Sequence, residues 1–288
     1  MTLVYACIAP HGGEIVSELA RDQKTAGLFS ETRFGMIRLA KQMKEANPDT
    51  IVIASPHNLR LWKKIGIVFS ENSSGYLLSD SKSKLRINLS VKCDTKFARE
   101  LFSSAINRKL PVVGANYGTF EGPLSDLPMD WGTFIPLWFF LNGEKHKGKR
   151  INNPMIVIVT PSREIPLRQN IEFGKTIAKL AESRKSSRIA FVASADQAHV
   201  HRRDGPYGFH ASARQFDEFA VNAIRNGNLS PLLRLDAGFV EDAKPDSLWQ
   251  LAILQGILIE LPMSAKLFSY QVPTYFGMIC AGFTPLKK

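Results

Sequence analysis

Short runs of apolar residues alternate along the chain with longer segments whose apolar positions recur at helical spacing. The short runs are rich in β-branched residues and lie at residues 3–9, 50–54, 155–159 and 189–193. Continuous apolar runs of this length are typical of strands that are buried on both faces. Because such strands alternate here with helical segments, the pattern predicts a sheet covered by helices on both sides.

The segments between these runs are predicted to be mainly helical. In residues 29–46 the apolar positions at helical spacing are Phe34, Ile37, Leu39 and Met43. Further helices are expected at residues 95–108, 166–184, 214–225, 231–236 and 247–261. Residues 63–90 are expected to form short strands and turns, and residues 270–283 a last strand or strand pair. We find neither a repeat nor a linker. We therefore expect residues 1–288 to form a single three-layer α/β/α domain with a central mixed, largely parallel sheet.

The composition fits a globular protein with a sizeable core. The chain has 288 residues, of which 44% are apolar, enough for one large domain. No apolar run reaches the ~18 residues that a membrane helix needs. Residues 2–9 follow no basic region, so we interpret them as a first strand rather than a signal peptide. Cys7, Cys93 and Cys280 are scattered thiols, which favours a reducing compartment and predicts a cytoplasmic protein.

A net charge of +11 could attract nucleic acid, acidic lipid or anionic small molecules. The basic residues are spread out, however, and the densest cluster, at residues 145–150, is expected to be a solvated loop between two apolar segments. Zinc-finger spacing, an aromatic RNA-binding motif and a basic helix are all lacking. We therefore expect neither nucleic acid nor a membrane as a partner.

Histidines follow three of the predicted strands. His11 and His57 each come soon after a strand, and the segment at residues 192–210 contains three of the chain's six histidines, His199, His201 and His210. A single histidine in such a place is more often an ordinary polar residue than a ligand. Because parallel neighbouring strands end at the same edge of a sheet, the recurrence favours one shared site.

Two histidines and one carboxylate are the donor set of non-haem Fe(II) sites, which leave three coordination positions open, and imidazole also suits zinc, copper and nickel. The carboxylate should come from the end of another element. By residue type the candidates are Glu14, Asp196, Asp204, Glu241, Asp242 and Asp246. Asp246 precedes an apolar periodic run, so its local context fits a helix N-cap as well as a metal ligand.

Six motifs together carry a family resemblance. They are APHGG, ASPH, DWGTFIPL, VASADQAH with DGPYGFH, EDAKPDSLWQL and SYQVPTYFGM. In their order and spacing they resemble the class III extradiol ring-cleavage dioxygenases. That superfamily includes the catalytic subunit of protocatechuate 4,5-dioxygenase, DOPA-type dioxygenases and the Memo proteins. The resemblance covers nearly the whole chain, and it is more specific for the superfamily than for any substrate.

The resemblance implies roles for particular residues. His11 and His57 match the two metal-binding histidines of the family. Asp246 aligns best with the third ligand, a carboxylate in the dioxygenases and a cysteine in Memo-like members, and Glu241 is the alternative. His199 matches the histidine that acts as acid and base.

Other positions depart from the family or lack a counterpart in it. Trp131 stands where many dioxygenases have a histidine that touches substrate, which puts the usual pose of the catechol in doubt. We expect Trp131 and Tyr207 to contact substrate. Gln271 replaces a glutamate of many relatives, while His201 and His210 match no family position and are interpreted as loop residues.

The function implied by the resemblance is that of a non-haem Fe(II)-dependent extradiol dioxygenase. Its partners would be dioxygen and a catechol-type aromatic, which is opened beside the diol, and His199 would accept a substrate proton and later return it. Zinc can occupy such a site in a crystal. A homo-oligomer is expected. Two alternatives are a Memo-like metal-binding protein, disfavoured by the carboxylate at the third position, and a zinc metallohydrolase.

Overall fold

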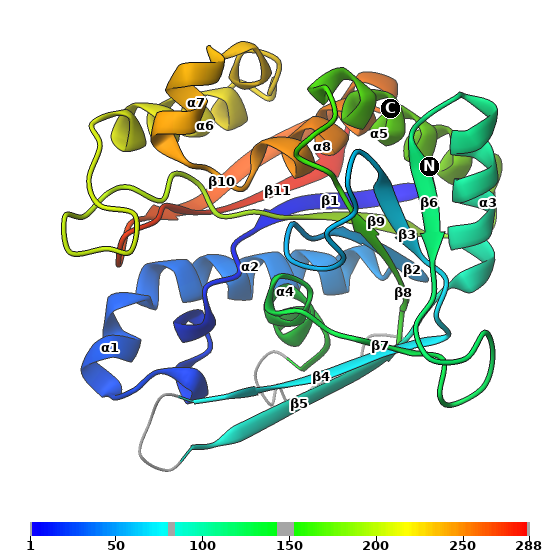
Figure 1. Ribbon diagram of the computed structural model, residues 1–288, viewed down its shortest axis with the longest axis horizontal. Coiled ribbons are helices and arrows are strands. Elements are labelled where there is room, and N and C mark those ends of the chain that lie inside the picture. Colours follow the sequence, from blue (N-terminus) through cyan, green and yellow to red (C-terminus); the bar gives the residue numbers. More distant parts are fainter. Residues whose placement is uncertain (1, 80–83, 143–152, 287–288) are drawn as a thin grey trace.

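Within residues 2–79, 84–142 and 153–286, which the computed structural model describes, an eight-stranded sheet has the order β10–β11–β1–β9–β2–β8–β3–β6 (Figure 1). Its strands are β1 (Leu3–Ala9), β2 (Thr50–Ala54), β3 (Ile65–Val68), β6 (Val112–Ala115), β8 (Met155–Thr160), β9 (Ile189–Ser194), β10 (Met263–Gln271) and β11 (Met278–Pro285).

The four strands predicted from apolar runs form the middle of this sheet. β1, β9, β2 and β8 are parallel neighbours in that order. β11 pairs antiparallel with β1 on one side, and β3 pairs antiparallel with β8 on the other. The prediction of an α/β fold with a mixed, largely parallel sheet is therefore confirmed.

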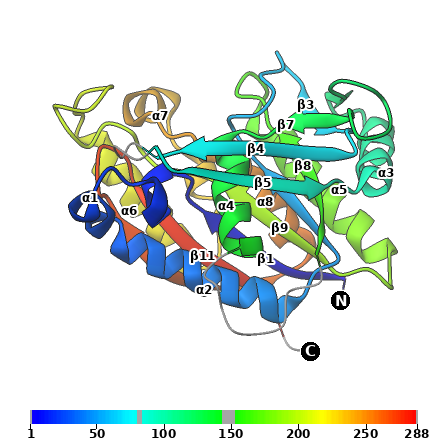
Figure 2. The same ribbon diagram turned by 90° about the horizontal axis from the view of Figure 1, so that it is seen from below.

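Helices cover both faces of the sheet (Figures 1 and 2). α3, α5 and α8 pack on one face, whereas α2 and α4 pack on the other. The α-helices are α1 (Gln23–Leu28), α2 (Ser30–Ala46), α3 (Thr95–Asn107), α4 (Trp131–Asn142), α5 (Leu167–Ser183), α6 (Ser212–Arg225), α7 (Ala237–Ala243) and α8 (Leu248–Glu260). The 3-10 helices are η1 (Gly13–Ile15), η2 (Ser17–Leu19) and η3 (Leu232–Arg234).

A second sheet lies beyond α4, on the side away from the central sheet (Figure 2). Its strand order is β5–β4–β7, with bounds β4 (Asn72–Leu78), β5 (Arg86–Lys92) and β7 (Asp126–Pro128). Alternate residues of β5 are buried and belong to the same core as α2 and α4. The second sheet therefore closes the core on that side.

Successive residues of the central strands bury their side chains on opposite faces. In β1, Ala6 and Ile8 belong to the core under α5 and α8, whereas Tyr5 and Cys7 belong to the core under α2 and α4. Both sets are almost fully buried. This double burial explains why the strands appear in the sequence as continuous apolar runs rather than as alternating patterns.

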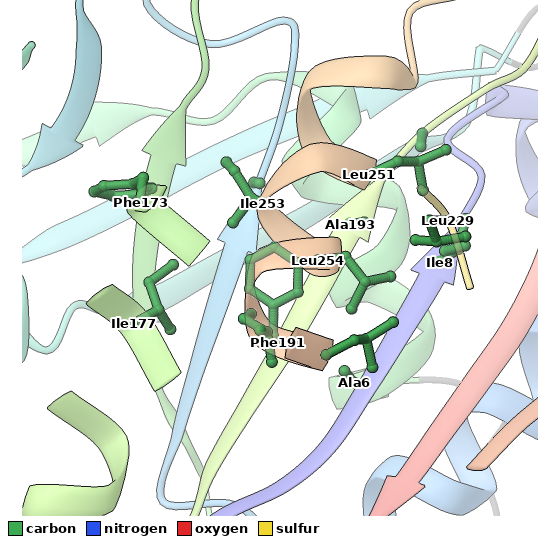
Figure 3. Packing of buried hydrophobic residues seen from close by; sticks show 14 of the residues in the cluster. Ala6, Ile8, Phe173, Ile177, Phe191, Ala193, Leu229, Leu251, Ile253 and Leu254 are labelled. Atoms are coloured by element: carbon green, nitrogen blue, oxygen red, sulfur yellow. The ribbon is translucent and has the colours of Figure 1, made fainter. Parts of the chain in front are cut away.

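Helices α5 and α8 cross at very short distance over β9, where their side chains form a continuous apolar cluster (Figure 3). Two glycines permit this approach. A side chain at Gly256 of α8 would meet the backbone carbonyl of Ile171 in α5, and one at Gly174 would meet the carbonyl of Ile253. The crossing thus requires residues without a Cβ atom at both contact points.

Replacing Gly256 with alanine is expected to lower the free energy of unfolding by about 1–3 kcal/mol, because the methyl group overpacks the crossing. Gly27 of α1 is a matched control, since no atom outside its own stretch of helix lies within 4 Å of the position of its missing side chain. Gly27→Ala should be neutral or stabilising by up to ~1 kcal/mol through helix propensity. Urea denaturation of both variants measures the difference. Equal effects would show that the crossing tolerates a methyl group.

Two predictions about helices need correction. Phe34 was assigned to the apolar positions of its helix, but its side chain is 66% exposed, and α2 is buried through Met36, Leu39 and Met43. The predicted helix at residues 231–236 is only the 3-10 turn η3. The chain then becomes extended and Asp236 caps a separate helix, α7, by accepting a hydrogen bond from the backbone N–H of Phe239. The cap at Asp236 therefore begins α7 as a helix separate from η3.

The structure also bears on several expectations that were drawn from composition. Cys7, Cys93 and Cys280 are buried free thiols, and burial raises the pKa of Cys93 to about 12. Among the described residues, no helix combines the length and apolarity needed to cross a membrane. The basic cluster at residues 145–150 lies outside the described residues.

Candidate metal centre

Three neighbouring parallel strands end at one edge of the central sheet and deliver polar side chains there. His11 follows β1, Asp196 follows β9, and His57 follows β2. Asp246 reaches the same place from the loop before α8. The edge formed by the carboxyl ends of parallel strands is the usual position of a site in an α/β fold.

His11, His57 and Asp246 converge on a single point. One potential ligand atom from each lies within 4.8 Å of the others. The Nε2 atoms of His11 and His57 are 3.0 Å apart, and each lies 3.2 Å from Oδ2 of Asp246. Three ligand atoms that face one another across this distance can surround one ion, so the geometry fits a metal.

Neighbouring groups orient the donor atoms from behind. Nδ1 of His11 lies 3.0 Å from Oγ of Ser194, whose hydroxyl donates to the carbonyl of Gly132. The oxygen of Ser194 therefore accepts from Nδ1–H, so in the neutral form that binds a metal the Nε2 lone pair of His11 would face the site. Oδ1 of Asp246 accepts the backbone N–H of Asp196 at 2.9 Å, so its other oxygen faces the histidines.

A second buried carboxylate adds negative charge to the site. Oδ2 of Asp196 lies 3.3 Å from Nε2 of His11. Burial disfavours the charged form of His11, but the carboxylates of Asp196 and Asp246 outweigh burial and raise its pKa from 6.5 to about 9. Burial raises the pKa of Asp196 to about 6. Against the effect of burial, the charge of His11 and hydrogen bonds from both histidines lower the pKa of Asp246. A bound cation would compensate the negative charge of the same two carboxylates.

The ring of His57 is held by stacking, and the loop that carries it is held by hydrogen bonds. It stacks on Trp131 with ring centroids 4.3 Å apart. The carboxylate of Asp130 accepts hydrogen bonds from the side chains of Ser55 and Asn58, which flank His57 in sequence. Trp131 is half exposed and lies beside a candidate ligand, whereas Asp130 holds the loop and caps α4.

His199 lies in the same cavity but outside the convergence point. It lines a pocket of about 630 Å³ together with His57, Asp246 and Tyr207. Its ring stacks on Phe276 with centroids 5.2 Å apart. Its Nδ1 is buried, and no hydrogen bond to its ring is found in the described part of the chain. The imidazole is thus oriented by packing, and its ring nitrogens form no hydrogen bond within the described residues.

Of the other candidate carboxylates, Asp196 lies beside His11 without belonging to the convergent group, whereas Glu241 and Asp204 lie away from the convergence point. Glu241 is exposed on α7 and pairs with Lys244 at 3.4 Å, although it lines the outer part of the pocket. Asp204 is exposed and pairs with Arg202. Asp246 does not act as a helix cap, because the N-cap residue of α8 is Ser247 and no side-chain capping bond forms there.

The remaining histidines of the segment 192–210 interact with residues outside the candidate site. Nε2 of His201 lies 2.9 Å from the buried carboxylate of Asp217, and His210 is exposed with its Nδ1 2.7 Å from Oγ of Ser212. Sequence reasoning assigned no role to Ser194 or Phe276. Phe276 lies within the motif SYQVPTYFGM, so its presence in a family motif was the signal that could have marked it.

If Asp246 is the third ligand, Asp246→Asn should lower metal affinity at least about tenfold, since the neutral amide preserves the shape but not the charge. Glu241→Gln is the matched control and should retain metal. Metal content after dialysis, measured by elemental analysis, distinguishes the two. The opposite pattern would transfer the ligand role to Glu241.

Comparisons with known proteins agree with this architecture. The chain is 23% identical over 280 residues to Protein CA_C1420 of Clostridium acetobutylicum, covering 97% of this chain but 56% of that protein. It therefore spans little more than half the length of that relative. Among solved structures, the uncharacterized protein JW3007 of Escherichia coli K12 shares the fold, with a TM-score of 0.59 and 14% identity over 97% of this chain and 99% of that one.

The family comparison extends over almost all of the described fold. The match runs from residue 5 to residue 283, from within β1 to within β11, and so includes the three convergent side chains and His199. The matching family is described as the catalytic LigB subunit of aromatic ring-opening dioxygenase. The chain therefore belongs to the LigB family of aromatic ring-opening dioxygenases, the class III extradiol family that its sequence motifs resemble.

Proposed function

We propose that the protein is a non-haem Fe(II)-dependent extradiol dioxygenase, which opens a catechol-type ring beside its diol and incorporates both atoms of dioxygen. The observation that carries the proposal is the convergence of His11, His57 and Asp246 beside a pocket that also contains His199. Two histidines and one carboxylate are the donor set of non-haem Fe(II) oxygenases. The family supports the broader class of aromatic ring-opening enzyme.

The bound ion would supply the redox chemistry and lower the pKa of a catechol hydroxyl. The residues of the chain would position the substrate and move its protons. His199 is suited to accept a proton from substrate and to return it later, because its ring has no hydrogen-bond partner among the described residues. Phe276 keeps that ring in one plane by stacking. Trp131 would similarly hold His57 in its orientation.

The proposal is tested with protein purified under anaerobic conditions. Its metal content is measured first, and oxygen uptake is then followed with a panel of catechols. We expect bound iron and an uptake of oxygen that matches the catechol consumed. Zinc in an aerobic preparation would not contradict Fe(II), because the affinity order of divalent metals favours zinc at such a site.

Two results would replace the proposal. Iron-loaded protein that consumes no oxygen with any catechol would favour a metal-binding protein without ring-cleaving activity. Zinc-loaded protein that hydrolyses ester or amide substrates, with no oxygen uptake in the iron form, would favour a metallohydrolase.

A further inference from the structure

The pocket beside the metal centre is much larger than a catechol ring. Its volume is about 630 Å³, within the range of ~300–1,000 Å³ that accommodates drug-sized ligands. The diol must lie at the inner end, near His57, Asp246 and His199, for the proposed chemistry to take place. The rest of the pocket is therefore available to a substituent on the ring.

The outer part of the pocket has an aliphatic wall, which we define by six of its lining residues. These come from the loop before α5, the start of α5, the η3 segment, α7 and the start of α8: Ile165, Leu167, Leu233, Leu235, Val240 and Leu248. Each of the six packs against the main core below α5 and α8. The aliphatic wall is thus a supported apolar surface that adjoins the metal centre, because Leu248 begins the helix that Asp246 precedes.

The charged groups of the pocket do not favour an anionic substituent. The cations among the described lining residues are Arg163 and Lys244, and both are exposed. Lys244 already pairs with Glu241, and the Arg163 guanidinium lies over the ring of Trp249 at 4.9 Å. A carboxylate in the pocket would also face the carboxylate of Glu241, which lines the same space. Desolvating an anion there would lack a buried partner to offset it.

Building on the function proposed above, we infer that the substrate is a catechol carrying an alkyl or aryl substituent, and that the aliphatic wall binds this substituent. Burial of apolar area would then provide a substantial part of the binding free energy and distinguish this substrate from an unsubstituted or carboxylated catechol. The substituent would also help to exclude water from the inner end of the pocket.

The inference is tested without turnover by calorimetry on iron-loaded protein under anaerobic conditions. The probes are a series of 4-alkylcatechols of increasing chain length, with protocatechuate as the anionic comparison. We expect Kd to fall about fourfold for each added methylene until the wall is filled, the fold-change that corresponds to ~0.8 kcal/mol per buried CH₂. A flat series, or tighter binding of protocatechuate than of the alkylcatechols, would overturn the inference.

A pair of variants locates the effect. Val240→Asp places a charge in the aliphatic wall and should abolish most of the dependence of Kd on chain length. Ile259 is an aliphatic residue of α8 that is 50% exposed and is not among the lining residues of the pocket, so Ile259→Asp should retain the dependence. If both variants keep it, the alkyl chain binds elsewhere and the inference is wrong.

Oxygen uptake with the same series separates this inference from the proposed function. Uptake with catechols at rates independent of the substituent would support ring cleavage and overturn the substrate class. Binding that depends on chain length, in protein that takes up no oxygen, would support the aliphatic subsite and overturn ring cleavage.

Discussion

Replacing His57 with alanine is expected to remove bound metal and ring-cleaving activity together. The Nε2 atom of His57 lies 3.0 Å from that of His11 and 3.2 Å from Oδ2 of Asp246, so the variant loses one of three convergent ligands. Loss of a group that only supports a ligand costs about 10–100-fold in metal affinity. Loss of the ligand itself should cost at least about 100-fold, and turnover should fall below detection.

His57 is the better histidine to test, because its substitution should not unfold the protein. The side chain of His57 is 23% exposed, whereas that of His11 is only 2% exposed. Truncating His11 to alanine would therefore leave a cavity in the interior of the protein. The matched control is His210→Ala, which removes an exposed histidine from the segment 192–210 and should keep both metal and activity. Elemental analysis and oxygen uptake are measured on both variants. A folded His57→Ala protein with full metal content would disprove the proposed ligand set.

Replacing His199 with alanine is expected to separate metal binding from turnover. His199 lines the pocket with His57 and Asp246, but it is not one of the three convergent residues. Metal content should therefore stay near that of the unmodified protein. Turnover should fall by roughly 10²–10⁴-fold, the usual effect of removing a positioned acid–base group.

Each alternative result for His199→Ala has a definite meaning. Loss of metal would make His199 a ligand. Unchanged metal content and unchanged turnover would show that the segment 192–210 is only a structural loop. A higher KM with unchanged kcat would indicate substrate binding instead of proton transfer. His210→Ala is again the control, since it alters the same segment away from the pocket.

Much of the fold could be predicted because its strands are recognisable from local sequence. The runs at β1, β2, β8 and β9 are continuous and apolar since both faces of each strand are buried. The helices that depend on a clear apolar face, such as α3 and α5, also lie close to their predicted bounds. The region of η3 and α7 was not resolved in the sequence, because a proline-initiated turn and the cap at Asp236 divide a short apolar segment.

The histidines of the candidate site could be proposed from sequence because each comes soon after a strand. Once β1 and β2 were recognised as strands of one parallel sheet, His11 and His57 were expected at a common edge, and both lie there. The two strands are not adjacent, since β9 lies between them and brings Asp196 and the His199 segment to the same edge. Sheet order of this kind depends on contacts between distant segments, which no local pattern records.

The sequence by itself determined the strand runs, the layers that cover them and the residue types at the strand ends. Residue type left six candidate carboxylates and the family resemblance favoured Asp246, but only the tertiary structure shows Asp246 beside both histidines and Asp196 beside His11. Asp246 is separated from His11 by 235 positions, and its side chain is directed inward by the placement of α8 and by the backbone N–H of Asp196. The aliphatic wall and the stacking of Phe276 on His199 also depend on contacts between segments that lie far apart in the sequence. By local preference alone, Asp246 could equally have capped α8. Its side chain faces the histidines instead because long-range packing fixes where the start of α8 meets the sheet.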